Sequence, residues 1–373
     1  MEYYACSRQE GYTERRMELS WVEDAAVQDC VRGIEQLVRH YSRRTEDFLE
    51  FINEGPDYLD FVAMEETDVI CLNTGGSQGE EQCIVPQERL VAIYPKEGTF
   101  VHGHPMAVVN ADWVTPEQAA AGEVFIEFVL MEAQQEYITS YGFRPANPNV
   151  QAGFMFTEEN GVQADFNTNI IAVPNDDVLI ALQENWSLVR KQADVWLVID
   201  VSGSMQEDGK LDQAKAAALA FLDNMDTSNR VGLAVFSDEV RVLVPLSNFE
   251  TNAANIRNFI GGLRAVGGTE LYGAVRDVVQ LATSTDEGDR IRAVVLLSDG
   301  EHTGDSGLVL ADATDAIRAS RDSANPIILV PVAYGSGADV SALNSMAGAS
   351  NTRVIFGDPN NINEVLQIIS SYF

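Results

Sequence analysis

The segment Val195-Trp-Leu-Val-Ile-Asp-Val-Ser-Gly-Ser204 decides how the C-terminal half of this chain folds. It begins with five apolar residues in a row, which is typical of a parallel β-strand covered on both faces. The run stops at Asp200, and a turn rich in glycine and serine follows. In doubly wound sheets such turns lie at the carboxyl ends of the strands, where ligands bind. The segment therefore predicts a central strand and a binding edge.

Strand and helix patterns alternate from this segment onward. Apolar runs predict strands at Val195–Ile199, Val231–Phe236, Val240–Leu246, Ile291–Ser298, Ile327–Ala333 and Arg353–Phe356. Apolar residues three and four apart predict helices at about Leu211–Met225, Asn252–Leu263, Leu271–Leu281, Leu310–Arg321, Val340–Met346 and Ile362–Ile369. A short Ser-Asp-Glu turn before Val240 suits an antiparallel hairpin. The fold class is therefore α/β, with a doubly wound, mostly parallel sheet and one antiparallel edge strand.

Three short motifs supply candidate metal ligands in this half. Asp200-Val-Ser-Gly-Ser204 ends the first strand, Val266-Gly-Gly-Thr269 lies between two helices, and Leu297-Ser-Asp-Gly300 ends the next buried strand. We expect them to converge at the carboxyl edge of the sheet. The predicted ligands all offer oxygen: Asp200, Ser202, Ser204, Thr269 and Asp299.

This donor set suits Mg²⁺ or Mn²⁺ and disfavours zinc, because hard cations prefer oxygen. Two carboxylates balance the charge of a divalent ion. Mg²⁺ takes six ligands, so one position stays open to an outside oxygen, ideally an Asp or Glu carboxylate of a partner protein. Each motif alone has a plainer interpretation, as a helix N-cap, a polar turn or a loop. Their order and positions together favour the metal site.

Asp-x-Ser-x-Ser, Gly-Gly-Thr and Ser-Asp-Gly, in this order, form the pattern of the von Willebrand factor type A family, which residues 194–373 resemble. The resemblance implies a Rossmann-like domain with a metal-ion-dependent adhesion site at Asp200, Ser202, Ser204, Thr269 and Asp299. It also implies a protein-binding module and not an enzyme.

The first half contains two predicted helices, and the sequence at the start of each has the spacing of a capping box. Ser20-Trp-Val-Glu23 predicts a helix with a buried face at Val27, Val31, Ile34, Val38 and Tyr41. Thr115-Pro-Glu-Gln118 predicts a helix that buries Phe125, Phe128 and Val129 and ends near Tyr141. Between them, short strands are expected at Tyr58–Met64, Leu90–Tyr94 and Met106–Val109. A linker at 151–193 then contains a short amphipathic helix, about Asp177–Arg190.

Five stretches of this half resemble the closing part of a bacterial extracellular solute-binding protein: Glu97–Phe100, His104-Pro105, Asp112–Glu117, Phe125–Phe128 and Tyr141–Pro145. Residues 1–150 are thus expected to form a partial α/β domain of that kind. Such a domain has two lobes and needs more chain before residue 20, so we expect a small solute to bind poorly. The resemblance implies an extracellular or cell-envelope location, although the first residues lack the pattern of a signal peptide.

The composition restricts the partners. The formal net charge of −33 disfavours nucleic acid and anionic membranes and favours divalent cations. No stretch reaches the ~20 apolar residues of a transmembrane helix. All four cysteines precede residue 84, and Cys71 and Cys83 flank a turn-rich stretch that a disulfide would close. Unpaired, buried thiols are an equally good interpretation.

Two other functions remain open. One is a Mg²⁺-dependent hydrolase or phosphotransferase that uses Asp200, although Ser202 stands where a second aspartate is usual. The four histidines form no His-Glu-x-x-His motif, and Ser202-Gly-Ser204 is no nucleophile elbow. The other is small-molecule sensing by the N-terminal half.

Overall fold

A computed structural model describes residues 1–38, 40–41, 45–53, 55–56, 59–78, 81–165, 169–284, 290–299, 302–321, 326–334, 338–350, 352 and 354–357. The chain divides into two compact units. The first combines Met1–Trp21 with Arg44–Val178, and the second combines Val22–Arg43 with Leu179–Phe373. The domain boundaries expected at 150 and 193 remain predictions. The predicted domains keep residues 22–43 in the N-terminal domain, whereas the structure groups these residues with the second unit. No helix in the described ranges is long and apolar enough to cross a membrane.

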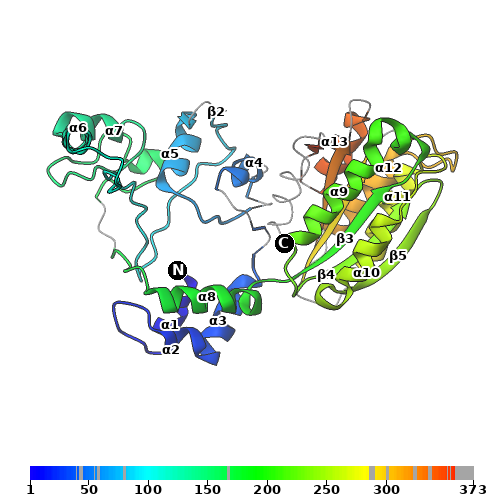
Figure 1. The fold of residues 1–373 in the computed structure, drawn as a ribbon, viewed down its shortest axis with the longest axis horizontal. Helices are drawn as coiled ribbons and strands as arrows, with labels where there is room; N and C mark the ends of the chain where they lie inside the picture. The colour runs from blue at the N-terminus through cyan, green and yellow to red at the C-terminus, as the bar shows by residue number, and fades with distance from the viewer. Residues whose placement is uncertain are drawn as a thin grey trace. The chain divides into compact units, whose positions relative to one another are not determined.

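The second unit is built on a six-stranded sheet with the strand order β5-β4-β3-β6-β7-β8 (Figure 1). The strands are β3 (Ala193–Asp200), β4 (Arg230–Phe236), β5 (Val240–Asn248), β6 (Ile291–Ser298), β7 (Ile327–Tyr334) and β8 (Ile355–Gly357). All neighbours pair in parallel except β5, which runs antiparallel to β4 at one edge. The predicted fold class of this half is confirmed. Arg353, the expected start of the last strand, lies outside the described residues.

Helices cover both faces of this sheet (Figure 1). They are α9 (Lys210–Asp223), α10 (Phe249–Gly261), α11 (Leu271–Ser284), α12 (Leu310–Arg321) and α13 (Val340–Ala349), and a 3₁₀ turn, η3 (Gly203–Gly209), precedes α9. Each predicted helix up to residue 349 is present. The closing helix expected at Ile362–Ile369 falls outside the described residues.

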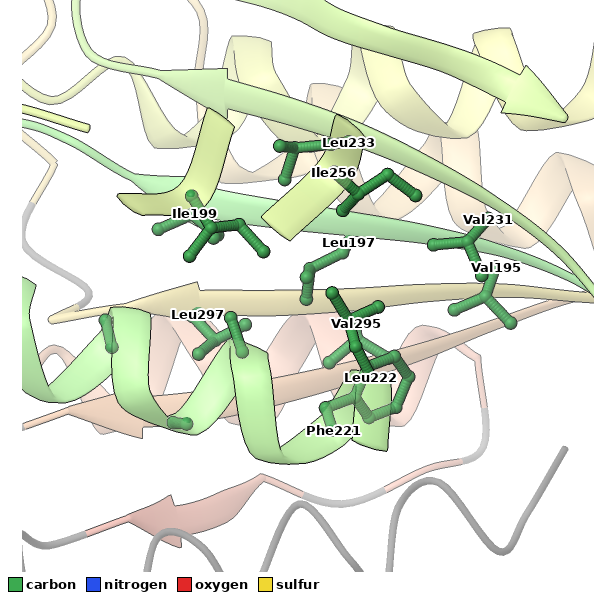
Figure 2. Packing of buried hydrophobic residues seen from close by; sticks show 14 of the residues in the cluster. Val195, Leu197, Ile199, Phe221, Leu222, Val231, Leu233, Ile256, Val295 and Leu297 are labelled. Atoms are coloured by element: carbon green, nitrogen blue, oxygen red, sulfur yellow. The ribbon is translucent and has the colours of Figure 1, made fainter. Parts of the chain in front are cut away.

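The core follows from the alternation of side chains along β3. Val195, Leu197 and Ile199 face α9 and α10, where they meet residues such as Phe221 and Ile256 (Figure 2). Trp196 and Val198 face the cluster formed by α11, α12 and α13. Every residue of β3 is buried, so the continuous apolar run has the two-sided covering that its pattern predicts. Each such side chain contributes roughly 1.5–3 kcal/mol.

A helical pair precedes the sheet within the second unit. In α3 (Ala25–Glu35) and α8 (Asp176–Val189), Gln28 donates to Asn185 over 3.1 Å, and the Arg32 Nε donates to the Leu188 carbonyl over 3.3 Å. Asp24, not Ser20, caps α3, because its side chain accepts from Ala26 and Val27. The capping box predicted at Ser20 is therefore wrong: Ser20 lies inside the short helix α2 (Leu19–Glu23), one turn too early.

The first unit contains short helices and one small hairpin. Its elements are α1 (Glu2–Gln9), η1 (Thr45–Phe48), α4 (Leu49–Asn53), α5 (Glu66–Thr74), β1 (Ser77–Gln78), β2 (Glu81–Gln82), α6 (Pro116–Val129), α7 (Glu132–Thr139) and η2 (Glu158–Asn160). A disulfide joins Cys71 to Cys83, with 5.8 Å between their Cα atoms. Of the two interpretations left open by the sequence, the disulfide is present.

The three strands expected in the first unit are absent from its described residues. In the segment Leu90–Tyr94, the Asn73 side chain takes both polar groups of the Leu90 backbone, at 2.9 Å each, and the Ala92 N–H donates to the Gly161 carbonyl. These bonds take the place of the hydrogen bonds that a neighbouring β-strand would make. Phe61 and Val109, in the other two segments, are 76% and 56% exposed. An alternating pattern without a partner strand does not form a sheet.

The second capping box is confirmed, but the helix that it begins is not as expected. Thr115 accepts from the Gln118 N–H, and Gln118 accepts from the Thr115 N–H. The helix α6 ends at Val129, and a separate α7 begins at Glu132. Phe125 and Phe128, predicted to be buried, are 56% and 45% exposed, and Val129 is half-buried. No described element covers this face.

The contact between Trp196 and Gly232 gives a test of the sheet. A Cβ atom added at Gly232 on β4 would lie 2.6 Å from the indole ring of its neighbour Trp196 on β3. We expect Gly232→Ala to lower the free energy of unfolding by about 1–3 kcal/mol through overpacking. In urea unfolding, the control Gly261→Ala near the end of α10 should be neutral or raise stability by up to ~1 kcal/mol, because its Cβ meets nothing described within 4 Å. Equal stability of both variants would contradict this packing.

Candidate metal centre

Two of the predicted ligands lie at the point where the strand order of the sheet reverses. Asp200 is the last residue of β3, and Asp299 directly follows β6. From β3 the chain goes to β4 and β5 on one side, and then returns to β6 on the other side. Loops that leave such a pair of neighbouring strands diverge to opposite faces and leave a crevice between them. The sheet therefore brings both carboxylates to its binding edge.

Asp200 is fully buried and held by two donors. Its Oδ1 accepts from the Ser202 N–H over 2.8 Å, and its Oδ2 accepts from the Ser298 hydroxyl over 2.7 Å. Burial raises its pKa to about 6, the two serines oppose this rise, and the negative charge of Asp299 adds to it. The Asp299 carboxylate is therefore close enough to Asp200 to repel its negative charge. Two neighbouring carboxylates of this kind form an electrostatic environment that suits a cation.

The two serines predicted as ligands lie together in the turn that follows. The Ser202 and Ser204 hydroxyl oxygens are 3.0 Å apart, with Ser202 buried and Ser204 half-buried. Residues two apart thus present neighbouring oxygens, as the sequence predicts. Neither hydroxyl has a histidine partner within the part of the chain that the structure describes.

Backbone hydrogen bonds attach the Thr269 loop to this turn. The Val266 N–H donates to the Val201 carbonyl over 2.7 Å, and the Gly203 N–H donates to the Gly267 carbonyl over 2.9 Å. Thr269 itself is 3% exposed. The backbone therefore holds Thr269 beside Asp200, Ser202 and Ser204, although these segments are more than sixty residues apart.

Sequence reasoning missed the residues that support this loop. The Asp238 Oδ1 accepts from the Gly268 N–H over 2.7 Å, and the Thr303 hydroxyl accepts from the Thr269 N–H over 3.0 Å. Asp238 belongs to the Ser-Asp-Glu turn, whose composition indicates only a hairpin. Thr303 lies just beyond the third motif, and its proximity to that motif is the single signal that could have identified it.

Asp299 has one oxygen paired and one oxygen free. Its Oδ2 accepts from the Lys210 ammonium over 3.0 Å, while its buried Oδ1 has no hydrogen-bond partner among the described residues. The Lys210 ammonium already gives the Oδ2 atom a positive partner. The Oδ1 atom, which has no partner among the described residues, is suited to a bound cation. The donor set, two carboxylates and three hydroxyls, fits a hard divalent cation. The described residues contain no group of three or more His, Cys, Asp or Glu side chains that could hold a metal ion, so this candidate centre depends on its three hydroxyls as well as its two carboxylates.

Gly267 gives a test of how this loop is built. Its φ is +90°, and an added Cβ would lie 2.4 Å from the Asp238 Oδ2. We expect Gly267→Ala to lower the free energy of unfolding by about 2–4 kcal/mol, since it adds a clash to the cost of a positive φ. The matched control Gly307→Ala has a φ of +78° and meets nothing described within 4 Å, so it should lose only about 1–2 kcal/mol. Urea unfolding of both variants measures the difference, and equal losses would remove the role assigned to Asp238.

Family comparisons agree with this arrangement. A family profile described as the von Willebrand factor type A domain matches residues 194–368, and one described as bacterial extracellular solute-binding protein matches residues 41–168. The inter-alpha-trypsin inhibitor heavy chain H4 of Homo sapiens is 36% identical over 118 residues, which are 29% of this chain and 12% of that protein. An uncharacterized protein, sll0103, of Synechocystis is 34% identical over 107 residues, 28% of this chain and 24% of that protein. The chain thus matches a quarter or less of the length of either relative.

Solved structures with similar chains were also found. A von Willebrand factor type A protein from Catenulispora acidiphila is 21% identical with a TM-score of 0.42, covering 49% of this chain and 43% of that one. A mussel byssus proximal thread matrix protein with a zinc-occupied MIDAS motif is 21% identical with a TM-score of 0.40, covering 48% and 47%. The family profile and the observed doubly wound sheet agree over the same residues. Residues 194–368 of this chain are therefore a von Willebrand factor type A domain, preceded by a segment that resembles the bacterial extracellular solute-binding proteins.

Proposed function

We propose that this domain is a metal-ion-dependent protein-binding module. Asp200, Ser202, Ser204, Thr269 and Asp299 hold a divalent cation, and an Asp or Glu side chain of a partner protein completes its coordination. The observation that carries the proposal is the state of Asp299, whose Oδ2 already holds an ammonium while its buried Oδ1 lacks a partner. A buried, unsatisfied carboxylate oxygen costs free energy, which a bound cation would recover.

Mg²⁺ is the ion that this donor set suits best, with Mn²⁺ as the alternative. Both prefer oxygen ligands, and Mg²⁺ retains exchangeable waters when a protein supplies fewer than six donors. A partner carboxylate can replace such a water. The ion would supply positive charge and an open coordination position; the chain's own residues hold it and orient the open side toward the surface.

The observations favour binding over catalysis. A serine nucleophile needs a base within hydrogen-bond reach, but the Ser202 and Ser204 hydroxyls bond to each other. For an Asp200 phosphotransferase, the carboxylate would have to face a substrate, yet both of its oxygens accept hydrogen bonds from serines and the residue is fully buried. Asp200 is thereby better placed as a ligand than as a nucleophile.

The Cys71–Cys83 disulfide bears on the compartment. Disulfides persist in oxidising environments, such as the cell surface and the bacterial periplasm. We therefore propose that the module works outside the reducing cytosol, in an extracellular or cell-envelope location.

Substitution of the ligands tests the metal site. Thr269→Ala removes one ligand oxygen, and we expect Mg²⁺ affinity to fall about tenfold or more while the free energy of unfolding falls by only about 1 kcal/mol. Asp200→Ala also removes one of two compensating charges, so Mg²⁺ binding should be lost. Thr269→Ser keeps the hydroxyl and should retain affinity. Calorimetric titration of Mg²⁺ and Mn²⁺ into the full chain measures these effects.

The matched control is Thr314→Ala on α12, another buried threonine, whose hydroxyl donates within its own helix to Ala311. Its metal affinity should equal that of the wild type. Equal affinity in the wild type, Thr269→Ala and Asp200→Ala would mean that the five residues form a structural turn, and the proposal would be wrong.

The raised pKa of Asp200 predicts a pH dependence. Its pKa is about 6 in the metal-free fold and 3.8 ordinarily, so the folded state binds the proton more tightly between these values. Mg²⁺ must displace that proton, and its affinity should fall up to about tenfold per pH unit below pH 6. In EDTA, the stability of the wild type relative to Asp200→Asn should fall by roughly 2 kcal/mol as pH rises from 4 to 6.

Urea unfolding of both proteins across this range, with EDTA and with saturating Mg²⁺, measures the second effect. Mg²⁺ should offset the fall in the wild type, because it stabilises the ionised carboxylate, and should not do so in Asp200→Asn. A stability difference that does not change with pH would contradict the assigned environment of Asp200.

A further inference from the structure

A groove adjoins the candidate metal centre. Its volume is about 520 Å³, which is within the usual range of ligand pockets. It lies between β5, α10 and the segment that leads into the Thr269 loop. Val201, in its wall, directly follows the ligand Asp200, and Val266, also in its wall, directly precedes Gly267. The groove and the metal centre therefore share two backbone segments.

The wall of the groove combines apolar surface with two arginines. Phe259 on α10 is 41% exposed although it is a large aromatic residue, and the buried Leu263 also lines the groove. Arg241 on β5 and Arg264 after α10 are both exposed and line the groove. Neither arginine has a carboxylate partner among the described residues, and no acidic residue lines the groove.

The two arginines carry positive charge in a chain that has 57 acidic and 24 basic residues. Other arginines of the same domain, such as Arg230, Arg257 and Arg290, are ion-paired. A local excess of positive charge in so acidic a protein attracts an anionic ligand. Because Phe259 and Leu263 also line the groove, a ligand that presents apolar side chains as well as negative charge would fit it best.

We propose that this groove receives the same partner segment whose carboxylate completes the metal coordination. The segment is acidic and apolar: one carboxylate reaches the ion, an apolar side chain packs against Phe259 and Leu263, and a second carboxylate lies between Arg241 and Arg264. This inference rests on the proposed function and adds to it the chemistry of the partner. Val201 and Val266 line the groove and are adjacent in sequence to Asp200 and Gly267, and this proximity along the backbone is the reason to assign the two sites to one ligand.

Labelled peptides test the inference on the full chain. The probes are fluorescein-labelled peptides with one aspartate, a glycine spacer, two leucines and two glutamates, made in both chain orders. The spacer varies from about one to four glycines, since each residue spans ~3.3–3.6 Å. Matched peptides carry asparagine and glutamine in place of the acids. Fluorescence anisotropy measures binding in Mg²⁺ and in EDTA, and calorimetry measures Mg²⁺ affinity separately.

At least one acidic peptide should bind the wild type in Mg²⁺. The same peptide should not bind in EDTA, and the matched amide peptide should not bind in either condition. Arg241→Glu and Arg264→Glu should each weaken this binding by about tenfold without changing Mg²⁺ affinity. Arg318→Glu on α12 is the matched charge reversal, since Arg318 does not line the groove, and it should leave peptide affinity unchanged. Far-ultraviolet circular dichroism checks that each variant is folded.

Three results would overturn the inference. If no acidic peptide binds although calorimetry shows Mg²⁺ binding, the groove is not part of the partner site. If Arg241→Glu and Arg264→Glu both retain Mg²⁺-dependent peptide binding, the groove is again not part of the partner site, although the proposed function would stand. Peptide binding that needs the arginines but persists in EDTA would separate the groove from the metal centre. Absence of Mg²⁺ binding in calorimetry would instead remove the proposed function itself.

Discussion

Two buried like charges at neighbouring strand ends are the constraint on which this domain depends. Asp200 and Asp299 are 0% and 2% exposed, and the charge of Asp299 makes ionisation of Asp200 less favourable. A buried carboxylate remains ionised only when hydrogen bonds or a cation offset its lost hydration. The chain offers three such offsets: hydrogen bonds from Ser202 and Ser298, a proton on Asp200, and the ammonium of Lys210. None of them reaches the Asp299 Oδ1, so the site remains incompletely compensated.

The sheet makes this arrangement possible. The apolar core on both faces of β3 contributes a large favourable free energy, and a domain with such a core can tolerate an unfavourable site at one edge. The cost is also confined in space. The Thr269 loop is hydrogen-bonded to Val201, Gly203 and Asp238, so the fold itself fixes the backbone that carries this predicted ligand. A preorganised site loses little conformational entropy when it binds its ion.

How much the sequence predicts depends on how local the determining contacts are. The strands of the second unit carry their own signal, because a strand buried on both faces is apolar at every position, as in Val195–Ile199. The five predicted ligands also come from three short local motifs, and their role as ligands stays a prediction. The strand predicted at Leu90–Tyr94 failed because Asn73 takes the backbone bonds of Leu90, a contact that no local pattern contains. Asp24 displaced Ser20 as the cap of α3, since two residues with capping chemistry lie four apart and packing selects between them. Lys210 and Asp238 were missed for the same reason, as their partners are thirty or more residues away.

The charge of the site explains how an acidic chain could bind an acidic partner. With both aspartates ionised and Lys210 charged, the metal-free site carries a single negative charge, and the net charge of −33 adds to the repulsion of a carboxylate. A divalent ion changes that local charge to a single positive one. Arg241 and Arg264, which have no acidic partner in the described parts of the chain, extend the positive region along the groove. A bound ion would thus reverse the sign of the local charge beside the proposed groove. A partner that depends on this reversal would be released when the ion is removed, even if every apolar contact remained.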